Sequence, residues 1–207
     1  MEEVRERVFT VIQNYLKTPP VIIWGSGATV PFGLPSMNTL NQILKDNIPD
    51  FDNNCDNLEI ELGKEKYNDL MPQIRNLIWN AISTVDSQVL QNLLISDGDE
   101  FIGIKKLVEK ISDAHPKVTN IITTNYDRII ENVLSFHNIP FTDGFLGKDL
   151  SLFNENLFSS KNIVNIVKVH GSLNWFEFGG EIRYLQKSIE SSVPQIICPG
   201  KNKYQEA

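Results

Sequence analysis

The residues most able to do chemistry lie in three short motifs, each of which follows an apolar run. The first is the glycine-rich stretch Gly25 to Thr29, GSGAT, which follows Val21 to Trp24. Its small side chains would let backbone N–H groups approach a phosphate, and Ser26 and Thr29 would add hydroxyl donors. Taken alone, the stretch is equally well a structural turn, because Val30 stands where the dinucleotide fingerprint G-x-G-x-x-G has its third glycine.

The other two motifs supply an amide, a carboxylate and a base. Asn125 and Asp127 stand two residues apart in the string TTNYD, after the apolar run 118–122, and His170 begins the string HGS after the run 163–169. A histidine has an ordinary pKa of about 6.5 and exchanges protons near neutral pH. Each residue also has a structural alternative: a turn for Asn125, the first turn of a helix for Asp127, and a hydrogen-bonded core position for His170.

The elements that must position these motifs alternate along the chain. We expect strands at 21–24, 118–123, near 140–142 and at 163–169, and helices at 2–16, 37–45, 101–112 and 127–137. Strands that alternate with helices predict an α/β fold, a Rossmann-like parallel sheet with helices on both faces. Ligands bind such sheets at the carboxyl ends of the strands, so the three motifs would meet at one edge.

One long stretch interrupts this alternation. Residues 47–57 are rich in Asn, Asp and Pro and predict a loop, and residues 58–94 show a helical but broken pattern. We therefore expect residues 47–100 to form a helical insertion or small lobe within a single domain that spans residues 1–207.

The pattern changes to short strands after the histidine motif. Gly179 and Gly180 separate two runs of β-type residues, which predicts a hairpin of 173–178 and 181–185. Residues 195–198 predict one further strand.

Composition excludes several classes of function. The net charge of −7 leaves no basic footprint for nucleic acid. Cys55 and Cys198 are isolated, so we expect free thiols, no metal site and a cytoplasmic location. The charged N-terminus resembles no signal peptide, and no apolar stretch approaches the roughly 20 residues of a membrane helix. His115 and His137 carry no motif, and we assign them no role.

The three motifs, taken in order, resemble those of the sirtuin NAD-binding fold over about residues 20–175. The resemblance implies a Rossmann-like sheet with a smaller inserted lobe, and NAD as the bound molecule. It places the NAD phosphates on Gly25, Ser26, Gly27 and Ala28. It places Asn125 and Asp127 near the nicotinamide and its ribose, and it makes His170 the catalytic base. We add Thr29, Pro35 and Ser172 to the predicted binding residues.

The sequence departs from the deacetylase sirtuins in three places. It has two distant cysteines where that group has the four of a zinc ribbon. Its first motif continues Gly33-Leu34-Pro35-Ser36-Met37-Asn38, without the aromatic residue and the arginine that help deacetylases to seat substrate and nicotinamide. It also shows no later glycine–serine element of the kind that lies near the adenosine in sirtuins.

The strings TTNYD and VHGSLNW resemble instead the sirtuin-like domains of bacterial anti-phage defence proteins, which cleave NAD. By this resemblance we expect a bacterial NAD glycohydrolase, a metal-independent hydrolase that depletes NAD as the effector of antiviral defence. Such domains are often fused to a sensor region or work with a partner. We therefore expect a homo-oligomer or a partner protein, and possible extension of the native chain beyond Ala207.

Two other classes of function stay open. An NAD-dependent protein deacylase or ADP-ribosyltransferase could use the same pocket, although the missing zinc ribbon counts against it. A non-catalytic module could bind NAD or ADP-ribose as a signal, although a pure binder needs neither Asn125 nor His170.

Overall fold

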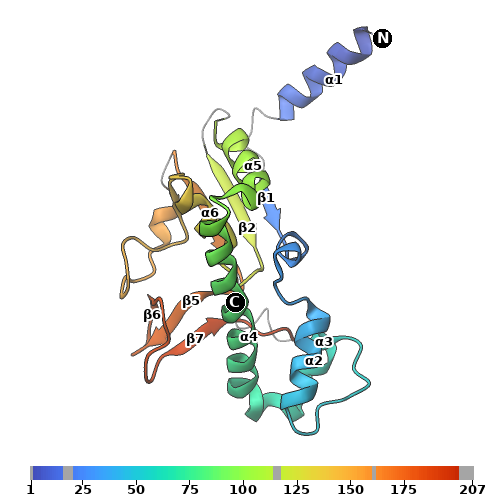
Figure 1. The fold of residues 1–207 in the computed structure, drawn as a ribbon, viewed down its shortest axis with the longest axis vertical. Coiled ribbons are helices and arrows are strands. Elements are labelled where there is room, and N and C mark those ends of the chain that lie inside the picture. The colour runs from blue at the N-terminus through green and yellow to red at the C-terminus, as the bar shows by residue number, and fades with distance from the viewer. Residues whose placement is uncertain (1, 16–20, 114–117, 160–161, 201–207) are drawn as a thin grey trace.

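The computed structural model describes residues 2–15, 21–113, 118–159 and 162–200, and Figure 1 shows two sheets with helices around them.

The larger sheet carries the three motifs. Its four strands are β1 (Val21–Trp24), β2 (Thr119–Thr123), β3 (Phe141–Thr142) and β4 (Val164–Lys168). They lie in the order β1-β2-β4-β3, and every neighbouring pair is parallel. The predicted α/β, Rossmann-like parallel sheet is therefore confirmed, and each predicted strand lies within one or two residues of the observed one.

The described part of the chain contains six α-helices, of which the first extends away from the sheets (Figure 1). They are α1 (Glu2–Tyr15), α2 (Met37–Asn47), α3 (Leu58–Leu62), α4 (Met71–Ile95), α5 (Ile102–Ser112) and α6 (Ile129–Phe136) among the described residues. Short 3-10 turns lie at Ser26–Ala28, Val30–Phe32, Glu65–Leu70, Asp99–Phe101 and Glu155–Ser159. The α2 helix begins where the sequence predicts, because the Ser36 hydroxyl accepts a hydrogen bond from the Thr39 amide at 3.2 Å.

The smaller sheet follows the histidine motif. Its strands β5 (Gly171–Phe178), β6 (Glu181–Tyr184) and β7 (Val193–Ile196) are antiparallel, in the order β6-β5-β7. The predicted hairpin is confirmed: Gly179 and Gly180 have φ values of 63° and 84°, as a primed turn requires. The last strand begins two residues earlier than predicted.

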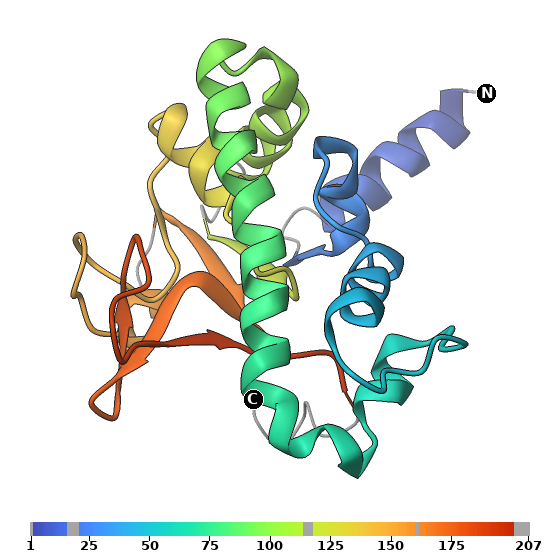
Figure 2. The ribbon, with the colours of Figure 1, turned by 60° about the horizontal axis from the view of Figure 1, so that its bottom comes forward.

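Helix α4 packs on the smaller sheet and on α6, the helix that covers the larger sheet. It crosses the molecule in front of both sheets in Figure 2, and it contacts α6, β5 and β7. The residues that α4 buries include Ile74, Ile78 and Ile82, which join one hydrophobic cluster with Ile129 of α6 and Leu173 of β5. The helices predicted for residues 58–94 are thus present, and they share a core with the rest of the chain; the division into domain and insertion stays a prediction.

A second hydrophobic cluster packs α5 and α6 onto the parallel sheet. Ile121 of β2 and Ile166 of β4 meet Val108, Ile130 and Leu134 from the two helices. Burying each such side chain stabilises the fold by about 1.5–3 kcal/mol. Helices α5 and α6 therefore stabilise the positions of β2 and β4, the strands that lead into two of the motifs.

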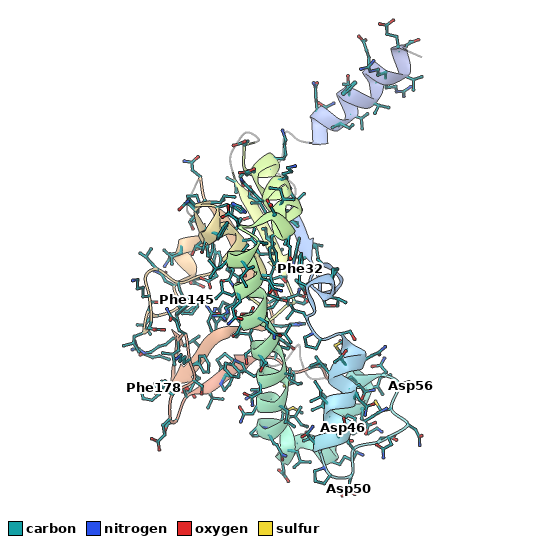
Figure 3. All side chains as sticks on the ribbon, in the orientation of Figure 1. Phe32, Asp46, Asp50, Asp56, Phe145 and Phe178 are labelled. Atoms are coloured by element: carbon teal, nitrogen blue, oxygen red, sulfur yellow. The ribbon has the colours of Figure 1, made fainter. Side chains whose placement is uncertain are left out.

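The side chains labelled in Figure 3 come from other parts of the molecule. Figure 3 shows Asp46, Asp50 and Asp56 gathered where α2 and its following loop form one end of the molecule. Phe178 lies near the tip of the hairpin, and Phe145 packs inside against the ring of Trp175, with centroids 5.5 Å apart. None of these labelled side chains belongs to the predicted site.

Helix α6 differs from its prediction in a way that bears on the site. The sequence predicts a helix from residue 127, whereas α6 begins at Ile129. Asp127 and Arg128 instead belong to a turn. Two buried ionic side chains, Lys168 and Asp86, bond to the main chain of this turn.

Candidate active site

The parallel sheet brings the three motifs to one cavity. Strands β1, β2 and β4 are neighbours and run in the same direction, so their carboxyl ends lie at one edge. A cavity of about 270 Å³ opens there. The predicted residues that line it are Ser26, Thr29, Pro35, Asn125, Asp127 and His170.

Asn125 connects the second motif to the first. Its side-chain amide donates a hydrogen bond to the Thr29 hydroxyl at 3.1 Å, and that hydroxyl donates to the Ser26 carbonyl at 3.2 Å. The Asn125 backbone N–H bonds to the Thr123 hydroxyl at 3.0 Å. Both Asn125 and Thr29 are buried. The amide of Asn125 therefore has a fixed orientation at the wall of the cavity.

Asp127 is a buried carboxyl group beside the same cavity. Burial raises its pKa to about 6; the charge of Lys168 opposes this rise, and the charge of Glu131 adds to it. One carboxyl oxygen accepts a hydrogen bond from the Ile129 amide at 3.3 Å, at the start of α6. Asp127 thus bonds to the first residue of α6 and also lines the cavity, and its chemical role stays a prediction.

His170 lies in the turn between β4 and β5 and is half-buried. Its carbonyl accepts a hydrogen bond from the Ile197 amide at 2.9 Å. The next residue, Gly171, has a φ of 79°, and a Cβ there would lie 1.9 Å from the Gln195 carbonyl oxygen. Only glycine fits this approach, so the glycine of the HGS string fixes the turn that presents His170.

The remaining predicted binding residues lie outside the cavity lining. Gly25, Gly27 and Ala28 belong to the turn at its rim, and a Cβ built on either glycine meets no atom within 4 Å. Ser172 is fully buried, and its hydroxyl donates to the Tyr126 carbonyl at 3.4 Å. The binding roles of these four residues stay predictions.

Of the other two histidines, His137 is described and is not part of the cavity lining. The His137 ring packs edge-on against Phe136, with centroids 5.0 Å apart. His115 lies outside the described residues.

Part of the cavity wall comes from segments that the sequence analysis did not single out. Glu59 of α3 and residues 197–199 after β7 line it. The Tyr126 hydroxyl donates to the Ile197 carbonyl, which holds that segment against the TTNYD turn. No local pattern signals this wall, because its parts are separated by more than a hundred residues of chain.

A set of buried charges surrounds the TTNYD turn. The carboxylate of Asp86, on α4, accepts hydrogen bonds from the Arg128 amide at 2.7 Å and from its guanidinium at 2.9 and 2.6 Å. On the other side, the Lys168 ammonium donates to the Asp127 carbonyl and, at 2.6 Å, to the Glu131 carboxylate. The sequence analysis missed these residues; a lysine inside the apolar run 163–169 was the one available signal.

Asp143 belongs to the same region. It follows β3, is buried, and has a pKa raised to about 6, chiefly by its burial and also by the charge of Glu131. The carboxyl ends of all four strands therefore contribute polar groups to one edge of the sheet.

Two general features of the described residues bear on function. No three or more of their His, Cys, Asp and Glu side chains are grouped so that they could hold a metal ion. Within those same ranges, no helix is long and apolar enough to cross a bilayer.

Comparison with known proteins adds one match. Residues 119–193 match the family described as SIR2-like domain. The match extends from β2 to the start of β7, and it contains Asn125, Asp127 and His170 but not the glycine-rich stretch. It supports a sirtuin-like fold for this part of the chain. No curated protein matches the sequence.

Proposed function

We propose that the protein is an NAD glycohydrolase, which hydrolyses NAD to nicotinamide and ADP-ribose. One observation carries the proposal: the glycine-rich stretch, the TTNYD turn and His170 border one cavity, and Asn125 bonds directly to Thr29 of that stretch. The match to the SIR2-like domain supports NAD as the substrate, because such domains use NAD.

The size of the cavity supports binding of one half of a dinucleotide within it. Its volume of about 270 Å³ lies near the lower end of the range for small-molecule sites, about 300–1,000 Å³. We assign the nicotinamide and its ribose to this space. The phosphates would then pass the rim at Gly25 and Gly27, where open space lies in front of the backbone.

The glycines at this rim have no evident role within the chain. Gly25 has a φ of −110°, which other residues adopt, and no neighbour would contact a Cβ on Gly25 or Gly27. Close approach of a ligand to the backbone explains small residues at such positions. This supports the assignment of Gly25, Ser26, Gly27 and Ala28 to the phosphates; Pro35 would contact the ligand deeper in the cavity, and Ser172 would support the site from behind the turn.

The reaction breaks the bond between the ribose C1′ and the nicotinamide nitrogen, and the electron pair stays on that nitrogen. Water forms the new bond to C1′ and loses a proton, which we assign to His170 as general base. Asn125 would hold a ribose hydroxyl in the orientation required for attack. Asp127, when ionised, would stabilise positive charge developing on the sugar.

Following the resemblance of TTNYD and VHGSLNW, we propose that the activity depletes NAD in the bacterial cytoplasm as part of anti-phage defence. We further propose that activity depends on assembly with other copies or with a partner protein. Exposed apolar side chains on α1, among them Val4, Val8 and Val11, support the assembly. Turnover per molecule should then rise with protein concentration.

The proposal is tested by incubating the purified chain with NAD at several protein concentrations and resolving the products by chromatography. Nicotinamide and ADP-ribose, formed without acyl peptide and lost in His170→Ala, are the expected result. Consumption of NAD only when acyl peptide is present would instead show a deacylase. Saturable binding of NAD with no product at any concentration would show a binding module.

A further inference from the structure

Lys168 joins the two halves of the candidate site. It is the last residue of β4, two residues before His170, and its side chain is fully buried. Its ammonium group reaches the turn after β2, where it donates to the Asp127 carbonyl, and it reaches the Glu131 carboxylate of α6 at 2.6 Å. One side chain thus connects the strand that leads to His170, the proposed base, with the turn that carries Asn125, the proposed ribose-binding residue.

The TTNYD turn is held through its main chain on the β4–β5 side. The Tyr126 carbonyl accepts hydrogen bonds from the Leu173 amide at 3.0 Å and from the Ser172 hydroxyl at 3.4 Å, and the Asp127 carbonyl accepts from Lys168. Because these bonds engage carbonyl groups, the side chains of Asn125 and Asp127 remain available to line the cavity.

Lys168 lies among several buried carboxyl groups. Glu131, Asp127 and Asp143 are all buried, and the charge of Lys168 acts on both aspartates. A buried ion pair gives little net stability, because desolvation of the two charges offsets their attraction. Supporting the fold is therefore a weak reason for a buried lysine at this position.

We propose that Lys168 is a positioning residue, whose buried ammonium holds the turn bearing Asn125 and Asp127 in place relative to His170. The charge of the same ammonium acts on the Asp127 carboxyl group. Its catalytic consequence rests on the NAD glycohydrolase activity proposed above. Its electrostatic consequence does not, and can be measured without NAD.

Every charged group near Asp127 must be considered in the test. Lys168 of β4, Glu131 of α6 and Asp86 act on its carboxyl group, and His170 and Glu59 line the same cavity. Arg128 is its neighbour in the chain and is paired with Asp86, and Asp143 after β3 is affected by the same charges of Glu131 and Lys168. Of these, Lys168 and Glu131 touch each other and act on Asp127 with opposite signs. Removing the charge of Lys168 should therefore raise the pKa of the Asp127 carboxyl group, and removing the charge of Glu131 should lower it.

The first measurement is a carboxyl-carbon NMR titration of Asp127 in the full chain, with the signal assigned by its loss in Asp127→Asn. Lys168→Met keeps much of the length of the side chain and removes its charge. It should raise the Asp127 pKa by about one unit or more, the usual effect of an opposite charge at short range. Glu131→Gln should lower it.

The second measurement is NAD turnover against pH. In Lys168→Met, kcat should fall on the order of 10–100-fold through misplacement of the turn, with a smaller change in KM, and the acid limb should move to higher pH. Tyr67→Phe is the matched control: it removes a buried hydrogen bond to Glu61, neither residue lines the cavity, and it should change stability without moving the acid limb.

The outcomes separate the two proposals. If the wild-type chain leaves NAD intact, the proposed function fails, and the titration still decides the role of Lys168. If the wild type cleaves NAD while Lys168→Met leaves both the Asp127 titration and the acid limb unchanged, Lys168 is only structural. Should Lys168→Met not fold, Lys168→Gln is measured in its place, because it can still donate a hydrogen bond to the Asp127 carbonyl but carries no charge; an unmoved Asp127 titration and acid limb in that variant overturn the inference.

Discussion

Two buried carboxyl groups of this protein have pKa values that are shifted in opposite directions. Glu61, on α3, has a pKa lowered to about 2, although burial alone would raise it, because it accepts hydrogen bonds from Lys64, Tyr67 and Lys66. Asp127, at the cavity, has a pKa raised to about 6 because its burial outweighs the charge of Lys168. Both side chains are almost completely covered.

The difference lies in the donors that each carboxyl group receives. The Glu61 carboxylate is bonded to the Tyr67 hydroxyl at 2.6 Å and paired with two lysines whose side chains are 46% exposed. Asp127 has one amide at 3.3 Å, while the nearby ammonium bonds to its backbone rather than to its carboxylate. A carboxylate that accepts several hydrogen bonds stays ionised at neutral pH and stabilises the fold, whereas a carboxyl group that is buried with few donors can change its charge near neutral pH.

The comparison distinguishes a stabilising ion-pair cluster from the proposed active site, and the largest effect is expected at the proposed base. His170→Ala should reduce NAD turnover by about 100-fold or more, since general bases contribute on that scale. The melting temperature should change little, because Gly171 and the Ile197 amide hold the turn through the backbone. Turnover of the variant at the wild-type rate would remove His170 from the mechanism.

Asn125→Ala should give the next largest effect. It removes the bond to Thr29 and the orientation of the ribose, so kcat should fall on the order of 10–100-fold with a smaller change in KM. Steady-state kinetics with purified variant and wild type measure both parameters. A variant that keeps its kcat and loses only affinity would make Asn125 a binding residue.

Asp127→Asn should separate activity from stability most clearly. Because the folded-state pKa lies above the ordinary 3.8, the ionised group destabilises the fold progressively as pH rises from about 4 through 6. The amide should therefore stabilise the protein above pH 6, by as much as about 3 kcal/mol, and leave it unchanged below pH 4.

Turnover of the same variant should nevertheless decrease, since the negative charge near the sugar is lost. Denaturant unfolding at pH 4 and pH 7, together with turnover at pH 7, tests both parts. Lower stability at pH 7 than the wild type would show that the Asp127 carboxylate belongs with Glu61 among the structural groups.

Glu61→Gln should have the smallest effect on the reaction and the opposite effect on the fold. The lowered pKa of Glu61 means that its ionised form stabilises the protein above about pH 4.5 and that this contribution is lost as pH falls towards 2. The glutamine variant should lose about 1–3 kcal/mol at pH 7, and its deficit should shrink at acid pH.

The NAD turnover of Glu61→Gln per folded molecule should equal that of the wild type. Thermal melts between pH 3 and 7 and turnover of the folded fraction measure the two effects. A change in kcat would show that the region of α3 acts on the cavity through more than its stability, for instance through Glu59.

Much of the fold followed from local pattern. Apolar runs and the glycine turns predicted the strands β1, β2 and β4 to within a residue at each end, and Gly179-Gly180 predicted the hairpin. Parallel strands then required the motifs at their carboxyl ends to lie on the same edge, as the cavity shows. These predictions succeeded because each depends on residues adjacent in the chain and on a general rule of sheet geometry.

The start of α6 and the buried charges did not follow from local pattern. Asp86 and Arg128 are 42 residues apart, and Lys168 lies 37 residues from Glu131. Their bonds hold residues 127–128 as a turn, so the helix begins at Ile129 instead of Asp127. Apolar periodicity predicts the helix, but it contains no information about the ion-pair partners that other elements supply.

The sequence by itself determined which residues can do chemistry and that the three motifs containing them follow strands of a parallel sheet. It did so because side-chain type and apolar periodicity are properties of neighbouring residues. Only the tertiary structure decided the pKa of Asp127 and the orientation of Asn125. Burial lifts the pKa of Asp127, the Lys168 ammonium opposes that rise, and Asn125 is oriented by a hydroxyl 96 residues away. Desolvation and Coulomb interaction depend on distance in space, and that distance exists only once the chain has folded.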